Sequence, residues 1–138
     1  MRRLKVVILL ITVLITAFAI MGCKNEEDEI KKLKDLEFTV VEDADVPGEL
    51  MEIINEKKEN PFRLSYSNKD YLYIVVGYGK QNSGGYSITV EDLYLTKNAI
   101  YIDTNLIGPS KDDLVTQGVT YPYIVVKTEF MDMKIVFE

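Results

Sequence analysis

The hydrophobic pattern of this chain changes at Pro61 from a helical repeat to a period of two, and this change limits the fold more than any other feature. After Pro61, β-branched, aromatic and aliphatic residues gather in short segments that end at turn-forming residues. These segments are 64–66, 71–78, 86–95, 99–107, 119–128 and 133–137. Short strands at regular spacing predict a mainly β (α+β) fold, built as an antiparallel sheet or a small β-sandwich.

Two of the predicted strands differ from the others because they are apolar at consecutive positions. Segments 71–76 and 123–126 contain almost no polar residue, whereas 86–91 alternates between apolar and polar side chains. A strand with one face in solvent alternates, and a strand covered on both faces does not. We therefore expect 71–76 and 123–126 to be central strands and 86–91 to be half buried.

One helix is predicted before the strands. Leu50, Ile53 and Ile54 fall on one helical face, Pro47 suits the first turn, and Asn60 before Pro61 stops the helix. The alternating segment 36–42 is expected to open the folded domain as a strand. The helix should then cover one face of the sheet.

The N-terminal segment has the order of a secretory signal. Arg2, Arg3 and Lys5 precede residues 6–21, which contain no charge and no proline and are short for a membrane span. The following Ile20-Met21-Gly22-Cys23 resembles the lipobox of bacterial lipoproteins. This resemblance implies cleavage after Gly22 and lipid attachment at Cys23, with the two or more acyl chains that stable anchoring needs. The alternative is an uncleaved N-terminal membrane anchor.

The predicted organisation is a lipoprotein signal peptide at 1–22, a charged tether at 23–35 and one β-rich domain at 36–138. Either kind of anchor places the domain at the cell membrane, on its extracytoplasmic face. Without residues 1–22 the chain has 13 basic and 22 acidic residues, which gives a net charge of −9. Nucleic acid and anionic lipid are poor partners for such a charge.

The chain has no histidine, and Cys23 is its only cysteine. These absences exclude Ser-His-Asp and Cys-His catalysis, thiolate zinc sites and imidazole metal sites. Carboxylate chemistry remains open, for example glycoside hydrolysis by Asp103 with Asp112 or Asp113, but no spacing selects that pair. The same acids lack the spacing of a calcium loop, so a solvated acidic loop is favoured. We expect no catalytic residues, no metal and no cofactor.

A glycine-rich polar segment separates two predicted strands. Residues 77–90 run from Gly77 and Gly79 through a polar stretch to Gly84-Gly85 and an alternating strand. This order predicts a hairpin whose glycines accept positive φ angles. It is not a phosphate-binding loop, because Gln81 follows Lys80 where such a loop needs Ser or Thr, and no helix follows.

This segment carries a family resemblance. Gly77, Gly79-Lys80, Ser83-Gly84-Gly85-Tyr86-Ser87-Ile88 and the later Tyr121-Pro122-Tyr123-Ile124-Val125-Val126 resemble the C-terminal domain of PrcB-type protease complex subunits. The similarity covers roughly 62–137. The sequence departs from the family pattern in a slightly longer loop at 80–83 and in the position of Pro109. The resemblance implies a non-catalytic, surface-attached accessory protein that helps a subtilisin-like protease mature, assemble or stay at the envelope.

The candidate partner-binding residues form one loop: Lys80, Gln81, Asn82, Ser83, Gly84, Gly85 and Tyr86. For Tyr86, a position in the core is a simpler explanation than a role as an interface anchor. Tyr78, Tyr101 and Tyr121 are expected to be the exposed tyrosines. The leading hypothesis is a lipid-anchored protein that binds and helps assemble a protein partner through these loops or an open sheet edge. A protease inhibitor and a small-ligand-binding lipoprotein are the alternatives.

Overall fold

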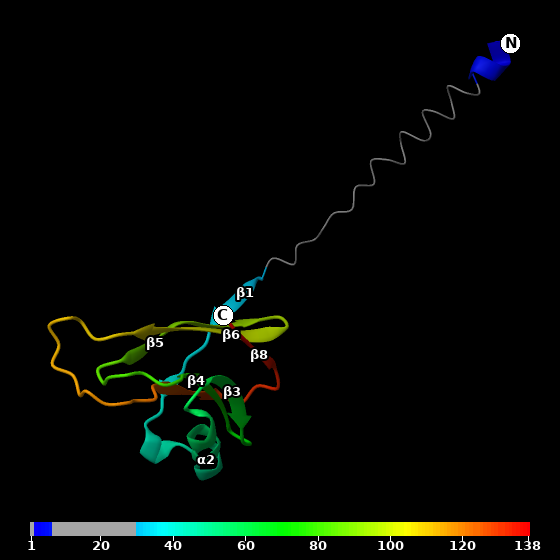
Figure 1. The fold of residues 1–138 in the computed structure, drawn as a ribbon. Coiled ribbons are helices and arrows are strands. Elements are labelled where there is room, and N and C mark those ends of the chain that lie inside the picture. The colour runs from blue at the N-terminus through cyan, green and yellow to red at the C-terminus, as the bar shows by residue number, and fades with distance from the viewer. Residues whose placement is uncertain (1, 7–29) are drawn as a thin grey trace.

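The computed structural model describes residues 2–6 and 30–138. Residues 2–6 are helical, and residues 30–138 form two four-stranded sheets that face each other, with a helix on the outer face of one sheet (Figure 1). In the described part of the chain, one helix has seven residues or more, and it precedes most of the strands. The predicted mainly β fold, a small sandwich with one N-terminal helix, is confirmed.

Sheet B is the central layer, and its strands are all antiparallel. Its order is β2 (Thr39–Val40), β7 (Tyr123–Glu129), β4 (Tyr71–Tyr78) and β3 (Pro61–Ser67). The two inner strands, β4 and β7, are the two segments whose sequence is apolar without alternation. One set of their side chains enters the core between the sheets and the other set packs under the helix. The prediction that both are central strands is therefore confirmed.

Sheet A is the outer layer on the other side. Its order is β1 (Lys32–Asp35), β5 (Ser87–Thr96), β6 (Ala99–Ile107) and β8 (Lys134–Phe137). The β1–β5 and β5–β6 pairs are antiparallel, but β6 and β8 are parallel. Parallel pairing arises because β8 is reached by a crossover from β7 in the other sheet rather than by a hairpin.

The core between the sheets consists of aliphatic side chains. Its buried members are Leu72, Ile74, Val76, Leu93, Ile100, Ile102, Ile124 and Val126. Each large aliphatic side chain buried in this way stabilises the fold by roughly 1.5–3 kcal/mol relative to exposure. Both sheets depend on this layer, since neither covers its apolar face alone.

Helix α2 (Gly48–Lys57) closes the second core. Leu50 and Ile54 are fully buried, and they pack with Tyr73, Val75 and Val125 of sheet B. The helix predicted between Pro47 and Asn60 is thus present, and it covers one face of a sheet as predicted.

Two tyrosine hydroxyls of sheet B tie the helical layer down. Tyr123 donates a hydrogen bond of 2.6 Å to Asp43 in the short 3₁₀ helix η1 (Asp43–Asp45), and Tyr66 donates one of 2.8 Å to Glu49 in α2. Burial first, and then the hydrogen bond and charge of Asp43, raise the pKa of Tyr123. The carboxylates are therefore held beside neutral phenols.

Strand β1 corrects one boundary. Residues 32–35, which the sequence assigned to the charged tether, pair with β5 in sheet A. Their polar composition gives no hydrophobic strand pattern, because this strand forms through backbone hydrogen bonds to the edge of a sheet. Of the predicted strand 36–42, only Thr39–Val40 is β-strand.

The signal segment at 7–21, Gly22, Cys23 and most of the tether lie outside the described residues. Among residues 2–6 and 30–138, no helix has the length and apolar character that crossing a membrane requires. Lipid attachment at Cys23 stays a prediction.

The predicted glycine hairpin is wrong. Strand β4 belongs to sheet B and β5 to sheet A, so the glycine segment crosses between sheets. The true hairpins are β3–β4 and β5–β6. The first is closed by the Asn68 side chain, which accepts from the Asp70 and Tyr71 amides, and the second by Thr96. Sequence period reveals which face a residue occupies, but not which strand is its partner.

Candidate partner-binding loops

Two crossover connections lie together at one end of the sandwich. The glycine loop (79–86) joins β4 to β5, and the long loop (108–122) joins β6 to β7. Figure 1 shows both loops projecting beyond the strands at the left of the view. They form the candidate site, because loops held by a rigid scaffold are common binding elements.

Backbone hydrogen bonds join the two loops. Gln81 and Thr120 exchange both of their N–H···O bonds, at 2.8 and 3.0 Å, as in an antiparallel bridge. The Thr120 hydroxyl donates a bond of 2.6 Å to the Ser83 carbonyl, and the Gly84 amide donates one of 2.9 Å to the Thr116 carbonyl. The two loops are therefore one braced unit.

Gly85 has a φ of +84°, and the space beside it is filled by the long loop. A Cβ on Gly85 would lie 2.5 Å from Val115 Cγ1 and 3.0 Å from Pro109 Cβ. Only glycine satisfies both the backbone angle and this close approach. Gly84 differs from the expectation, because no positive φ occurs there and its nearest neighbour would be Thr116 Cβ at 3.5 Å.

The body of the domain holds the base of the braced unit. The Tyr78 amide donates to the Pro122 carbonyl at 3.0 Å, and the Lys80 amide donates to the Glu59 carbonyl at 3.2 Å. On the other side, the Tyr86 ring lies so close to Gly108 that a Cβ there would be 3.3 Å from Cε1. These contacts fix where the loops leave the strands.

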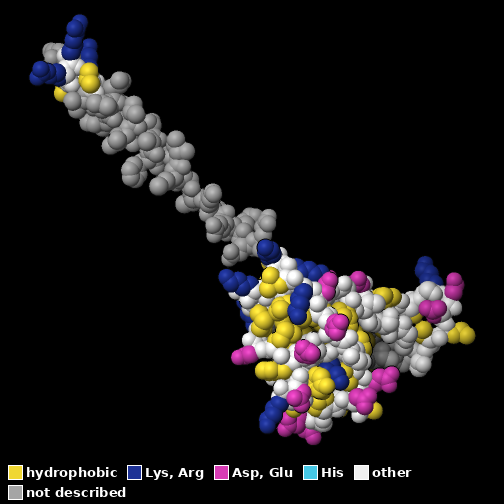
Figure 2. All heavy atoms as spheres, turned by 180° about the vertical axis from the view of Figure 1, so that it is seen from behind, with side chains coloured by type: hydrophobic (Ala, Val, Ile, Leu, Met, Phe, Trp, Pro, Cys, Tyr) yellow, Lys and Arg dark blue, Asp and Glu magenta, His cyan; other side chains and the backbone are white. Residues whose placement is uncertain are grey.

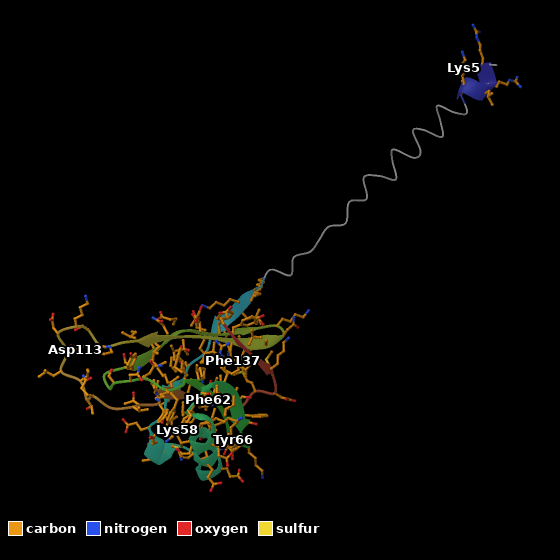
Figure 3. All side chains as sticks on the ribbon, viewed as in Figure 1. Lys5, Lys58, Phe62, Tyr66, Asp113 and Phe137 are labelled. Atoms are coloured by element: carbon orange, nitrogen blue, oxygen red, sulfur yellow. The ribbon has the colours of Figure 1, made fainter. Side chains whose placement is uncertain are left out.

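The tip of the long loop is its most exposed part. Leu114 is fully exposed, and the Ser110 amide donates a 2.7 Å bond to the neighbouring Asp113 carboxylate. The Asp113 amide donates back to the Ser110 carbonyl at 3.1 Å, so the turn is closed from both sides. Figure 3 shows Asp113 at the far end of the molecule, and Figure 2 shows an apolar side chain with acidic and basic neighbours on the projecting arm.

The seven candidate residues take different places in this unit. Lys80, Asn82 and Gly85 are exposed, whereas Gln81, Ser83, Gly84 and Tyr86 are partly covered. The partly covered residues lie against the long loop or the end of β6, so the exposed side chains at 80 and 82 are the ones free to meet another molecule. Tyr86 is half buried, so its exposure does not decide between a core position and an interface anchor.

The sequence did not single out Leu114. The available signal was Leu114 beside Val115 within the otherwise polar residues 110–117, outside every predicted strand. The expectation for tyrosines was also wrong in part. Tyr78, Tyr101 and Tyr121 are only partly exposed, and Tyr71 is the tyrosine among the large exposed residues.

The structure does not assemble the proposed carboxylate pair. Asp103 lies within β6 opposite Asp92, whereas Asp113 is hydrogen-bonded within the turn at the loop tip. Across the residues that the structure describes, no group of three or more potential metal-ligating side chains occurs. The loop end offers an exposed surface and a braced backbone.

The fold and its braced loops define a class: a two-sheet β-sandwich with one helix, whose crossover loops are presented together at one end. The model of the PrcB C-terminal family matches residues 72–129. Residues 72–129 therefore form a PrcB C-terminal-like region, and the resemblance seen in the glycine segment is confirmed. The match runs from β4 to β7 and includes both loops. Neither the curated proteins nor the solved structures gave a match to this chain.

Proposed function

We propose that this chain is a non-catalytic, lipid-anchored extracytoplasmic protein that binds and helps assemble a protein partner, in particular a subtilisin-like protease. The family description names the C-terminal part of PrcB, and the PrcB-type subunits it resembles belong to protease complexes. The observation that carries the proposal is Leu114, a fully exposed leucine on a loop that is braced to its neighbour.

Bracing by the neighbouring loop affects binding affinity, because association orders any segment that was mobile in the free protein. A loop that is already fixed by its neighbour loses less conformational entropy on association, so more of the contact energy appears as affinity. An exposed leucine at such a position gains by being covered, through the area of apolar surface removed from water. Lys80 and Asn82 lie exposed on the adjoining loop and supply a polar rim.

Strand addition at a sheet edge is the less favoured mode. Three of the four edge strands are short: β2 has two residues, and β1 and β8 have four each. Short and lysine-bearing edges discourage pairing with another strand. Only β3, with seven residues, offers a longer edge. The loop end is the surface on which the proposal rests.

Direct inhibition of a protease is a second candidate. A rigid, projecting loop with an apolar side chain at its tip has the shape needed to enter an active-site cleft, and the Ser110–Asp113 turn supplies that rigidity. Dose-dependent inhibition of the co-purified protease by the purified protein would favour inhibition. Unchanged or increased protease activity would favour assembly.

The test is affinity purification of the tagged full-length protein from native membranes after mild crosslinking. Wild type should recover an envelope or secreted serine protease, and Leu114→Glu should recover much less. The matched control is Phe130→Glu, which changes another exposed apolar residue at the opposite end of β7. Equal loss in both variants, or no protease with wild type, would contradict the proposal. Mass spectrometry of the same sample tests the lipid on Cys23.

A further inference from the structure

A second surface lies where the chain enters the domain, beside β1. A hollow of about 510 Å³ is found there, and its lining includes Ile30, Lys31, Leu33, Lys97 and Lys134, here called the lysine surface. We propose that the lysine surface rests on a membrane that contains anionic phospholipid and so fixes the orientation of the domain. This inference rests on the proposed lipid anchor at Cys23.

The charge of the lysine surface is unbalanced. Its polar lining consists of Lys31, Lys97 and Lys134 together with Thr96, Asn98 and Tyr101, and within residues 30–138 no carboxylate is among the lining residues. Lys32, the first residue of β1, differs from these lysines because it forms salt bridges to Asp35 and Asp92. Among the described residues, Lys31, Lys97 and Lys134 form no salt bridge, so phosphate groups outside the protein can meet them. The acidic residues 26–29, which precede Ile30 in the sequence, lie outside the described residues.

Apolar side chains accompany these lysines. Ile30 and Leu33 are each 57% exposed, on the segment that carries Lys31. Exposed aliphatic residues between lysines are typical of surfaces that lie at a lipid interface, with the apolar groups entering the headgroup boundary and the ammonium groups meeting the phosphates. An acidic protein partner would explain the lysines, but the adjoining chain leads to the predicted lipid.

The layer that contains α2, on the other side of the domain, is strongly acidic. Residues 42–59, which contain α2, hold seven acidic residues and two lysines, a net charge of −5. In Figure 2 dark-blue side chains gather at the top of the domain, where sheet A lies, and magenta ones are frequent at the bottom, where α2 lies. A negative membrane repels the α2 layer, which favours the orientation with the lysine surface toward the bilayer. The net charge of −9, given above for the chain without residues 1–22, does not reveal that the lysine surface is locally basic.

The chain length keeps the lysine surface near the bilayer. Ile30 lies seven positions after Cys23, and an extended chain spans at most about 3.6 Å per residue. The lysine surface therefore stays within roughly 25 Å of a lipidated Cys23. Electrostatic attraction is screened over a Debye length of about 8 Å at physiological salt, so it acts only when the lysine surface lies within about that distance of the bilayer, which the length of the chain permits.

The test uses the lipidated full-length protein in nanodiscs with a headgroup acceptor dye. Lipidation consumes Cys23, the only cysteine, so a donor dye can be attached at Asn98→Cys beside the lysine surface or at Glu52→Cys on α2. We expect energy transfer from position 98 to increase when phosphatidylglycerol replaces part of the phosphatidylcholine, and transfer from position 52 not to increase. About 1 M NaCl, where the Debye length is about 3 Å, should remove the difference.

Lys97→Glu/Lys134→Glu should abolish the increase at position 98. The matched control, Lys80→Glu/Lys111→Glu, makes the same charge change on the loops at the other end of β5 and β6 and should retain it. Equal transfer in both lipids with wild-type protein, or equal loss in both variants, would overturn the inference while leaving the anchor intact. An intact mass with unmodified Cys23 would overturn the anchor as well.

Discussion

Gln81 and Thr120 lie 39 positions apart in the chain, yet they exchange both backbone hydrogen bonds, at 2.8 and 3.0 Å. This bridge joins a connection that leaves sheet B to one that returns to it. It converts two crossovers, each with unpaired backbone groups, into a single unit that satisfies them. The stability of the loop end therefore depends on both loops together.

Gly85→Ala should weaken this unit. The substitution places a Cβ in a backbone region that costs roughly 1–3 kcal/mol for other residues, and against Val115 Cγ1 at 2.5 Å. We expect the free energy of unfolding to fall by at least about that amount in urea denaturation. Gly84→Ala is the control, with no positive φ and an ordinary 3.5 Å contact, and should change stability by less than about 1 kcal/mol. Equal effects would contradict the assignment of Gly85.

Amide hydrogen exchange should report the bracing directly. The amides of Gln81, Gly84 and Thr120 all donate across the loops, so we expect them to be protected and to exchange as one group. Thr120→Val removes the hydroxyl bond to the Ser83 carbonyl, which is worth about 1 kcal/mol, and should accelerate their exchange roughly fivefold. Acceleration at Thr120 alone would show that the loops open independently.

Alkaline pH should destabilise the helical layer through Tyr123. Its pKa is raised by burial and then by Asp43, so the folded state retains a proton that the unfolded state loses above pH about 10. Stability is therefore complete below that pH and falls as pH rises further. Tyr123→Phe should flatten this fall and reduce stability at neutral pH by about 1 kcal/mol, measured by denaturation across pH.

Asp43→Asn separates the two causes of that pKa shift. It retains an acceptor for Tyr123 but removes the charge, while burial of the phenol is unchanged. The alkaline loss of stability should then be intermediate between wild type and Tyr123→Phe. A profile identical to that of Tyr123→Phe would show that Asp43 alone causes the shift.

The same substitution at two paired positions should separate the core from the edge. Val40 of β2 and Val126 of β7 are opposite each other in sheet B, but Val126 is fully buried and Val40 is 52% exposed. Val126→Ala should cost about 2 kcal/mol from lost transfer energy and a cavity, and Val40→Ala less than about 1 kcal/mol. Thermal or urea denaturation of both variants is the measurement. Similar losses would mean that β2 is packed more tightly than its exposure indicates.

The parts of the fold that were predictable are those where burial leaves a local pattern. Continuous apolar sequence in 71–76 and 123–126 predicted the two central strands, and the spacing of Leu50 and Ile54 predicted the helix face. The partition into two sheets was not predictable, because a period of two fixes the face of each residue and leaves its partner strand open. This is why the glycine segment looked like a hairpin.

The candidate site was predictable only in part. The glycine loop was predictable from the pair Gly84-Gly85 in the sequence. The structure shows that the φ angle of Gly85 and its close neighbour require glycine there. The long loop did not, because its contacts to the glycine loop use backbone groups that every residue carries. For the same reason the lysine-rich residues 32–35 gave no sign of strand β1, which forms by backbone pairing at the edge of β5.

The pairing of β2 with β7 sets a lower limit on when the domain finishes folding. Thr39 lies opposite Lys127, so sheet B cannot be completed until nearly the whole chain is present. Contacts this distant in sequence form slowly, because the entropy cost of closing a large loop comes before the contacts can stabilise the fold. Under the proposed export, which would begin at the N-terminus, the emerging chain would have no finished sheet B and would complete it only after Lys127 had followed.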